Sequence, residues 1–156
     1  MNNIGLIDFF KDQAEANEQI GRITTYAQNY YTIATSQGVE GAVITGKLLY
    51  ESVYPRIGDF VVYEKTDDGS LNVIKRILDR RTCLSRKIAG EKSDEQIIAA
   101  NMDYVFLVMS LNEDFNIRRL ERYLIGAWES GAEPVVILLN WTCVTISRIK
   151  LLKLKL

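Results

Sequence analysis

Apolar and polar residues alternate along the first half of the chain in short runs that turn residues separate. Five runs rich in Val, Ile, Thr and Tyr cover residues 22–27, 30–35, 39–45, 60–64 and 71–78, with breaks such as Gln28-Asn29 between them. β-branched and aromatic residues favour strands, whereas Gly, Asn and Asp favour turns. Five short strands in so little chain predict a small closed barrel, with the OB-fold as the first candidate and an SH3-like barrel as the second.

The pattern changes in the second half of the chain. Residues 104–109 and 135–139 are continuous apolar runs of strand length, and the apolar positions 117, 120, 124, 127 and 128 between them share one helical face. Asn116 suits the N-cap of this helix and Gly131 suits its end. The order predicts a βαβ unit whose parallel strands are buried on both faces. The fold class is therefore mainly β plus an α/β fragment.

Two further segments complete the expected organisation. Residues 7–18 predict a short amphipathic helix, and Gly90 and Ser93 indicate a connector. We expect an N-terminal arm over residues 1–19, a barrel over 20–82, a linker over 83–99, a βαβ fragment over 100–140 and a basic tail over 141–156.

Composition narrows the possible functions. The chain is 47% hydrophobic and 25% charged, which is typical of a globular protein. It has neither an apolar run long enough for a membrane helix nor a secretion signal at its start, so we expect no membrane contact and a cytoplasmic location. With no histidine and only Cys83 and Cys143, the sequence excludes a disulfide framework, a Cys/His zinc site and a Ser-His or Cys-His nucleophile.

Basic residues concentrate within residues 75–92, although the formal net charge is only −1. Such a stretch, with tyrosines at positions 26, 30, 31, 50 and 54, can track phosphates and stack on bases. The expected RNA-binding residues are Arg22, Lys47, Arg76, Arg80, Arg81, Arg86, Lys87, Tyr30 and Tyr31. In the alternative interpretation the tyrosines point into the barrel core and the basic residues form a solvated face.

A set of segments in fixed order carries a resemblance to a known family. The segments are ITGKL (44–48), PRIGDFVV (55–62), LSRK (84–87), QIIAANMD (96–103), SLNEDFN (110–116), RLERY (119–123) and PVVILLN (134–140). With them the chain resembles the ribosome small-subunit-dependent, circularly permuted GTPases of the RsgA type, over about residues 20–140.

The resemblance implies a fold and a function. It implies an OB-fold that contacts ribosomal RNA, followed by a P-loop-type GTPase domain in which the guanine-reading Asn-Lys-x-Asp motif precedes the phosphate-binding loop. It also implies that full-length members bind GTP, magnesium and zinc and hydrolyse GTP during maturation of the small ribosomal subunit. The implied partner of this chain is the small subunit and its 16S rRNA.

The chain departs from the family pattern after Asn140. Asn140 matches the first residue of the guanine motif, but Trp141, Thr142 and Cys143 stand where Lys, any residue and Asp are expected. The motif's Asp carboxylate accepts two hydrogen bonds from guanine, and no Asp or Glu follows Asn140 here. The sequence also lacks a Gly-x-x-x-x-Gly-Lys-Ser/Thr loop. We therefore expect no catalytic residues, no metal site, no bound cofactor and no GTP hydrolysis by this chain.

The tail supports two interpretations. Codons for residues 141–146, read one base out of frame, are compatible with the x-Asp-Leu expected after Asn-Lys, so we hypothesise a truncating frameshift, which sequencing of the DNA would test. Alternatively, residues 149–156 are a basic amphipathic segment that touches RNA or a membrane. For the whole chain, the rival function is a non-catalytic fragment that binds protein or self-associates through exposed βαβ edges.

Overall fold

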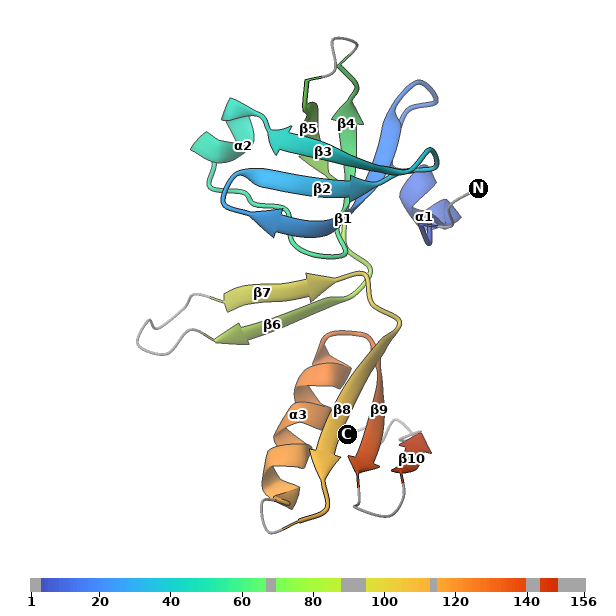
Figure 1. Ribbon diagram of the computed structural model, residues 1–156, viewed down its shortest axis with the longest axis vertical. Helices are drawn as coiled ribbons and strands as arrows, with labels where there is room; N and C mark the ends of the chain where they lie inside the picture. The colour runs from blue at the N-terminus through green and yellow to red at the C-terminus, as the bar shows by residue number, and fades with distance from the viewer. Residues whose placement is uncertain (1–3, 67–69, 88–94, 113–114, 140–143, 149–156) are drawn as a thin grey trace. The chain divides into compact units, whose positions relative to one another are not determined.

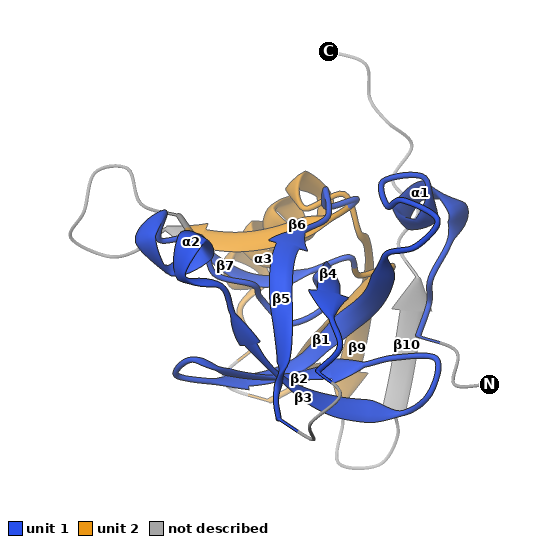
Figure 2. Ribbon diagram, turned by 90° about the horizontal axis from the view of Figure 1, so that it is seen from above, with its two compact units in different colours: residues 1–81, 97–101 blue, residues 82–96, 102–156 orange. Residues whose placement is uncertain are grey.

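The computed structural model describes residues 4–66, 70–87, 95–112, 115–139 and 144–148 (Figure 1). The chain forms two compact units (Figure 2). Unit 1 contains residues 1–81 and 97–101, and unit 2 contains residues 82–96 and 102–156. Each unit has its own hydrophobic core.

Unit 1 contains a closed barrel of five strands in the order β1-β2-β3-β5-β4. The strands are β1 (Gln19–Ala27), β2 (Tyr30–Ala34), β3 (Val39–Ile44), β4 (Phe60–Glu64) and β5 (Asn72–Ile77). β3 pairs with β5 in parallel, and β4 closes the barrel by pairing antiparallel with both β5 and β1. This five-stranded Greek-key barrel confirms the expected OB-fold over the SH3-like alternative.

The alternation of side chains along the strands forms the barrel core. Ile23, Ile33, Val61 and Ile74 are at most 1% exposed, and each contributes about 1.5–3 kcal/mol by leaving water. All five predicted strands are present. The largest difference is the start of β1, which begins at Gln19 instead of residue 22.

The N-terminal helix is much shorter than predicted. α1 (Asp8–Lys11) has four residues, whereas the apolar spacing predicted a helix over residues 7–18. The carbonyl of Gln13, which a longer helix would use internally, accepts a hydrogen bond from the Arg76 guanidinium at 2.8 Å. Tertiary contacts therefore hold this arm on the barrel in place of further helical turns.

A second short helix, α2 (Gly46–Tyr50), connects β3 to β4 and was not predicted. Thr45 is its N-cap, and the Thr45 hydroxyl accepts a hydrogen bond from the backbone N–H of Leu48. Thr is a favoured N-cap residue, so the sequence contained a signal for this helix. Leu48 is buried against the barrel core.

Unit 2 contains the predicted βαβ arrangement. β8 (Tyr104–Ser110) pairs in parallel with β9 (Glu133–Leu139), and α3 (Ile117–Glu129) connects them. The Asn116 side chain caps the helix by accepting a hydrogen bond from the backbone N–H of Arg119 at 3.0 Å. Gly131 follows the helix with φ of 83°, a conformation that favours glycine. Trp128 packs against the core of this unit, as expected.

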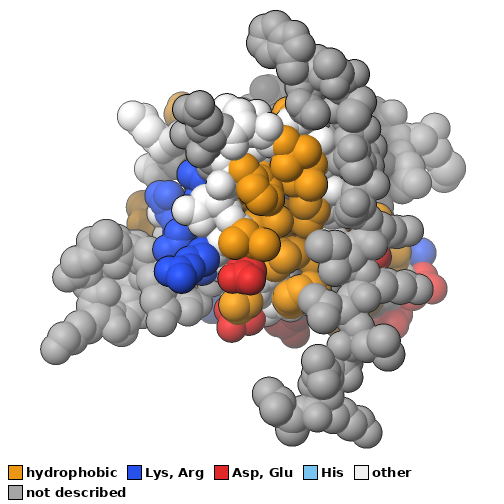
Figure 3. Space-filling view, turned by 90° about the horizontal axis from the view of Figure 1, so that it is seen from below, with side chains coloured by type: hydrophobic (Ala, Val, Ile, Leu, Met, Phe, Trp, Pro, Cys, Tyr) orange, Lys and Arg blue, Asp and Glu red, His pale blue; other side chains and the backbone are white. Residues whose placement is uncertain are grey.

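The prediction that both faces of the parallel strands are buried is wrong for β8, although Pro134, Val135 and Val136 of β9 are all buried. Tyr104, Phe106 and Val108 of β8 are 43%, 61% and 55% exposed, because α3 packs on the opposite side chains of the strand. Ile117, assigned to the buried face of the helix, is 60% exposed. Figure 3 shows one face of the molecule on which hydrophobic side chains gather.

Short strands occupy segments that were expected to be irregular. β6 (Cys83–Lys87) and β7 (Glu95–Ala100) form a two-stranded sheet within the expected linker. β10 (Val144–Arg148) pairs antiparallel with β9 and adds a third strand to the sheet of unit 2. Among the residues that the structure describes, no helix combines the length and hydrophobicity needed to cross a membrane.

Candidate functional site

The β1–β2 hairpin carries the most exposed aromatic residue of the barrel strands. Residues 24–30 are all exposed, and Tyr30 is 62% exposed. Gln28 and Asn29 form the turn between the paired residues Ala27 and Tyr30, and Gln28 has a positive φ of 54°. None of residues 24–30 is charged. The hairpin tip therefore presents a tyrosine ring and two side-chain amides to solvent.

Tyr26 lies on the opposite face of the hairpin from Tyr30, because side chains alternate along paired strands. The Tyr26 ring stacks on Tyr31 with centroids 6.3 Å apart, and Tyr26 remains 40% exposed. The Arg56 guanidinium lies over the Tyr26 ring at 5.7 Å from its centroid and donates to its hydroxyl at 3.4 Å. These three residues form a layered cluster that begins in the core and ends at the surface.

Tyr31 is not available for contact with a ligand. It is 3% exposed and belongs to the barrel core, as the alternative interpretation of the tyrosines described. Burial raises the pKa of the Tyr31 hydroxyl, and the nearby charge of Arg56 opposes this effect. The inner end of the aromatic cluster is therefore structural.

Three of the expected RNA-binding arginines make contacts within unit 1. Arg80 donates two hydrogen bonds of 2.7 Å to the two carboxylate oxygens of Asp59, which is 0% exposed. Arg76 forms an ion pair with Glu18. Arg22 donates to two backbone carbonyls and lies over an aromatic ring of the core. These guanidinium groups stabilise the barrel and leave few donors for phosphates.

The other expected basic residues have different surroundings. Lys47 has a side chain that is 78% exposed and lies 4.0 Å from a carboxylate of the same helix region. Arg81 is exposed in unit 1, whereas the Arg86 guanidinium donates to a glutamine side chain within unit 2. The side chain of Lys87 lies outside the described residues. Within unit 1, Lys47 and Arg81 are the expected basic residues whose side chains are exposed.

Arg56 is the residue of this cluster that sequence reasoning missed. It lies 30 positions from Tyr26 along the chain, so no local pattern joins the two. Its position directly after Pro55 gave no indication of its partner. Only the closure of the barrel brings the arginine over the ring.

The residues that the structure describes do not provide a site for a guanine nucleotide and its metal. Asn140 lies outside the described residues, and the Lys and Asp that should follow it are absent from the sequence. In the described part of the chain, no group of three or more His, Cys, Asp or Glu side chains could hold a metal ion. The chemistry of phosphate transfer requires both a phosphate cradle and a metal site.

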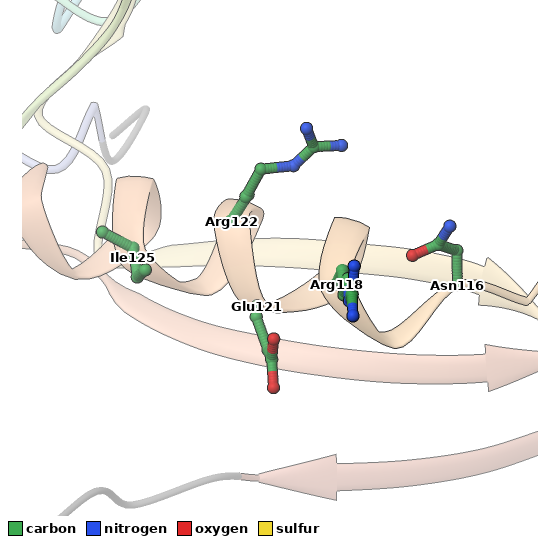
Figure 4. Close-up of a pocket in the computed structure, with 5 residues that line it drawn as sticks. All are labelled: Asn116, Arg118, Glu121, Arg122 and Ile125. Atoms are coloured by element: carbon green, nitrogen blue, oxygen red, sulfur yellow. The ribbon is translucent and has the colours of Figure 1, made fainter.

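A pocket on α3 gives no alternative site. It has a volume of about 530 Å³ and is lined by Asn116, Arg118, Glu121, Arg122 and Ile125 (Figure 4). The side chains of Arg122 and Glu121 point to opposite sides of the helix, and Asn116 is already used as the helix cap. These side chains do not converge on a common point where a substrate could react.

The family model and the similar proteins all belong to the same family. The family model for RsgA GTPase matches residues 77–152. The match extends beyond Asn140, where the sequence analysis expected the family pattern to end. The small ribosomal subunit biogenesis GTPase RsgA 2 of Lactiplantibacillus plantarum is 43% identical over 132 residues, which cover 81% of this chain and 37% of that protein.

Two further proteins extend the comparison. The small ribosomal subunit biogenesis GTPase RsgA 2 of Listeria monocytogenes is 42% identical over 142 residues, which cover 88% of this chain and 39% of the relative. The crystal structure of YjeQ from Thermotoga maritima matches 78% of this chain and 41% of its own with a TM-score of 0.59 and 21% identity, a likeness of fold. The chain thus spans less than two fifths of the length of these two curated relatives.

Proposed function

Because the chain belongs to the RsgA GTPase family, we propose that it is the N-terminal part of a small ribosomal subunit biogenesis GTPase. We propose further that it binds the 16S rRNA of that subunit through its barrel, in the cytoplasm. The observation that supports this proposal is an OB-fold with an exposed aromatic hairpin, since OB-folds commonly bind oligonucleotides by stacking bases on such rings.

Each part of the chain has its own role in such a protein. Residues 20–82 bind RNA, residues 100–140 begin a GTPase domain, and residues 141–156 follow the incomplete guanine motif. Of the expected contact residues in unit 1, Tyr30, Lys47 and Arg81 have exposed side chains. Arg22, Arg76, Arg80 and Tyr31 support the barrel, which makes Arg80→Ala a test of stability instead of RNA contact.

The binding experiment is co-sedimentation of the chain with purified small ribosomal subunits in buffer without nucleotide. We expect saturable binding to small subunits and none to large subunits at the same concentration. Tyr123→Ala, which changes an exposed ring on α3, serves as a control that keeps full binding. Equal association with both subunits, or no association, would contradict the proposal.

We propose that GTP, magnesium and zinc belong to the longer protein and that this chain alone does not hydrolyse GTP. The absent Lys, Asp and phosphate loop support this assignment. Titration with a fluorescent guanine nucleotide tests it. Saturable binding that guanine nucleotides displace and adenine nucleotides do not would overturn it.

Self-association is the second candidate function, and the exposed side of β8 favours it. Tyr104, Phe106 and Val108 present apolar surface on the sheet face opposite α3, and contiguous apolar surface promotes association. Light scattering during size-exclusion chromatography measures the mass. A dimer that Phe106→Glu converts to a monomer would support this function, and a wild-type monomer at all concentrations would exclude it.

A further inference from the structure

Resting on self-association, the second candidate function, we propose that two copies of this chain pair along the open edge of β8. The two β8 strands run antiparallel in one continuous sheet, with Leu107 at the twofold axis. Phe106 of each copy then lies beside Val108 of the other. The partner is a second copy of this chain, and backbone hydrogen bonds and apolar side chains form the contact.

β8 lies at one edge of its sheet. In the described part of the chain, the sheet of unit 2 has the order β10-β9-β8, so β8 pairs with β9 alone. Figure 1 shows β8 and β10 on opposite sides of β9. A strand at an edge presents N–H and C=O groups to which another strand can add. β10, at the other edge, is shorter and ends at Arg148, and a basic residue at an edge opposes pairing.

The peptide groups of Phe106 and Val108 face the open edge of β8. The backbone N–H of Leu111, directly after β8, donates to the carbonyl of Leu139 at 2.8 Å, so position 111 faces β9. Backbone groups alternate between the two sides of a strand, so odd-numbered positions of β8 face β9 and even-numbered positions face away from it. A second strand can therefore bond to Phe106 and Val108 without breaking a bond to β9.

The sequence and shape of β8 offer little protection against strand addition. Its seven residues, YVFLVMS, include no charged residue and no proline. Its register with β9 runs without a shift from Tyr104 to Ser110, so no bulge turns the edge away. Charged residues, prolines and bulges are the features with which natural edge strands avoid pairing. Their absence from β8 favours the addition of a strand.

The antiparallel register centred on Leu107 is self-complementary. It places Phe106 opposite Val108 of the second copy, once on each side of the axis, and an aromatic residue opposite a β-branched residue is a favourable cross-strand pair. These side chains are 61% and 55% exposed in the single chain, so pairing removes part of their apolar surface from water. Asp103, just before β8, lies opposite Leu111, so the register brings no like charges together.

The first experiment measures the dimer dissociation constant of the full chain by analytical ultracentrifugation. We expect Val108→Pro to weaken dimerisation at least about fivefold, because it removes one hydrogen bond between the chains from each copy. Val108→Ala is the matched control, since it shortens the same side chain but keeps the N–H, and it should weaken dimerisation less. Proline is tolerated where an edge N–H faces solvent, and thermal unfolding confirms that each variant is folded.

Disulfide formation tests the register without a proline. Phe106→Cys and Val108→Cys are introduced separately into chains that also carry Cys83→Ser and Cys143→Ser. Directly opposite residues of a hydrogen-bonded antiparallel pair have Cα atoms about 5.5 Å apart, within the range of a disulfide. We expect a mixture of the two variants to form more cross-linked dimer than either variant alone. Equal cross-linking in all three samples would overturn the register.

Amide hydrogen exchange, measured by NMR, gives a readout within the strand. The N–H groups of Phe106 and Val108 should become protected as the protein concentration rises. Those of Leu107 and Met109, which face β9, should be protected at every concentration. Protection of Phe106 and Val108 in the monomer would mean that other residues of the same chain cover this edge, and it would overturn the proposal.

Two further outcomes distinguish edge pairing from self-association in general. A dimer that Phe106→Glu dissociates but Val108→Pro leaves intact would overturn edge pairing and keep self-association through the apolar face. A wild type that stays monomeric at all concentrations would overturn both. Neither result changes the proposed RNA function, which co-sedimentation with small subunits tests separately.

Discussion

Asn101 is buried at 5% exposure and has a positive φ of 55°, a conformation in which Asn is among the few tolerated residues. Its side chain donates to the carbonyl of Gly58 at 3.1 Å and accepts from the backbone N–H of Arg81 at 2.8 Å. Its own carbonyl accepts from Arg22 at 2.8 Å. These bonds attach residues 97–101 to the barrel.

Gly58 makes the closest approach in this region. It has a positive φ of 90°, and a Cβ atom there would lie 2.0 Å from the carbonyl oxygen of Ala100. We expect Gly58→Ala to lower the free energy of unfolding of unit 1 by roughly 3–5 kcal/mol, because it adds both a backbone clash and a strained φ. Urea denaturation measures the change.

Gly46→Ala is the matched control, because a Cβ at Gly46 would meet nothing within 4 Å. At the start of α2 this change should leave stability within about 1 kcal/mol of the wild type. Equal effects of the two substitutions would show that the approach of residue 100 to Gly58 does not matter for stability.

Glu18 makes the stability of the barrel depend on pH. Its hydrogen bond with Arg76 lowers the pKa of the Glu18 carboxyl below the usual 4.5, with help from the backbone N–H of Glu15. A carboxyl with a lowered pKa stabilises the folded state above its unfolded pKa, and this stabilisation is lost as the pH falls through the folded value. The wild type should therefore exceed Glu18→Gln in stability at neutral pH.

The difference between the two proteins should shrink as the pH falls below 4.5. Denaturation in urea at a series of pH values measures it. A difference that is constant with pH, or that grows toward acid, would contradict a role for the ionised Glu18–Arg76 pair.

The sequence showed which side chains are aromatic or basic, but it did not show which groups these side chains contact. Tyr30 was expected to be exposed and is exposed, whereas Tyr31, the next residue, is buried. Both interpretations were open, because the face of a strand depends on its register in the barrel. The basic character of Arg80 was equally visible, but its bond to Asp59, 21 positions earlier, forms only when the barrel closes.

At the scale of elements, strands were easier to predict than short helices. The period of the apolar residues determined β1 to β5 and α3, since the pattern itself creates the buried face. α1 and α2 have four and five residues, too few for periodicity to define. The exposed side of β8 could not be predicted, because an apolar strand has the same sequence whether or not a second layer covers it.

The docking of α1 is testable through two neighbouring phenylalanines. Phe10 is 2% exposed and its ring stacks on Phe60 at 4.1 Å, whereas Phe9 is 44% exposed. We expect Phe10→Ala to destabilise unit 1 by about 3–5 kcal/mol through the cavity it leaves, and Phe9→Ala by less than about 1 kcal/mol. Thermal unfolding followed by circular dichroism compares them, and a larger loss in Phe9→Ala would show that the arm docks differently.

At the scale of the whole molecule, the division into units does not follow the chain order. Residues 97–101 belong to unit 1 although they follow fifteen residues of unit 2, the segment 82–96. A sequence pattern predicts consecutive domains, so it assigned residues 83–99 to a linker. The return of the chain depends on bonds of Asn101 that no local pattern reveals.

The contents of the two units explain why we propose RNA contact and not catalysis. The barrel is closed and has a core of its own, so it contains all the elements that an OB-fold needs. Strand β8 of unit 2 packs against a helix on one side and has exposed apolar residues on the other. The chain spans less than two fifths of the two relatives' length, and its sequence has no Asp or Glu after Asn140.

RNA binding by the barrel is tested most directly by dimethyl sulfate probing of small-subunit RNA. The probing is done in nucleotide-free buffer, with and without the 156-residue chain. This reagent modifies accessible base edges of unpaired nucleotides. The account predicts a local group of protected unpaired bases that appears with the wild-type chain and disappears with Tyr30→Ala. Unchanged reactivity with bound wild-type chain, or protection that appears only when GTP is added, would contradict it.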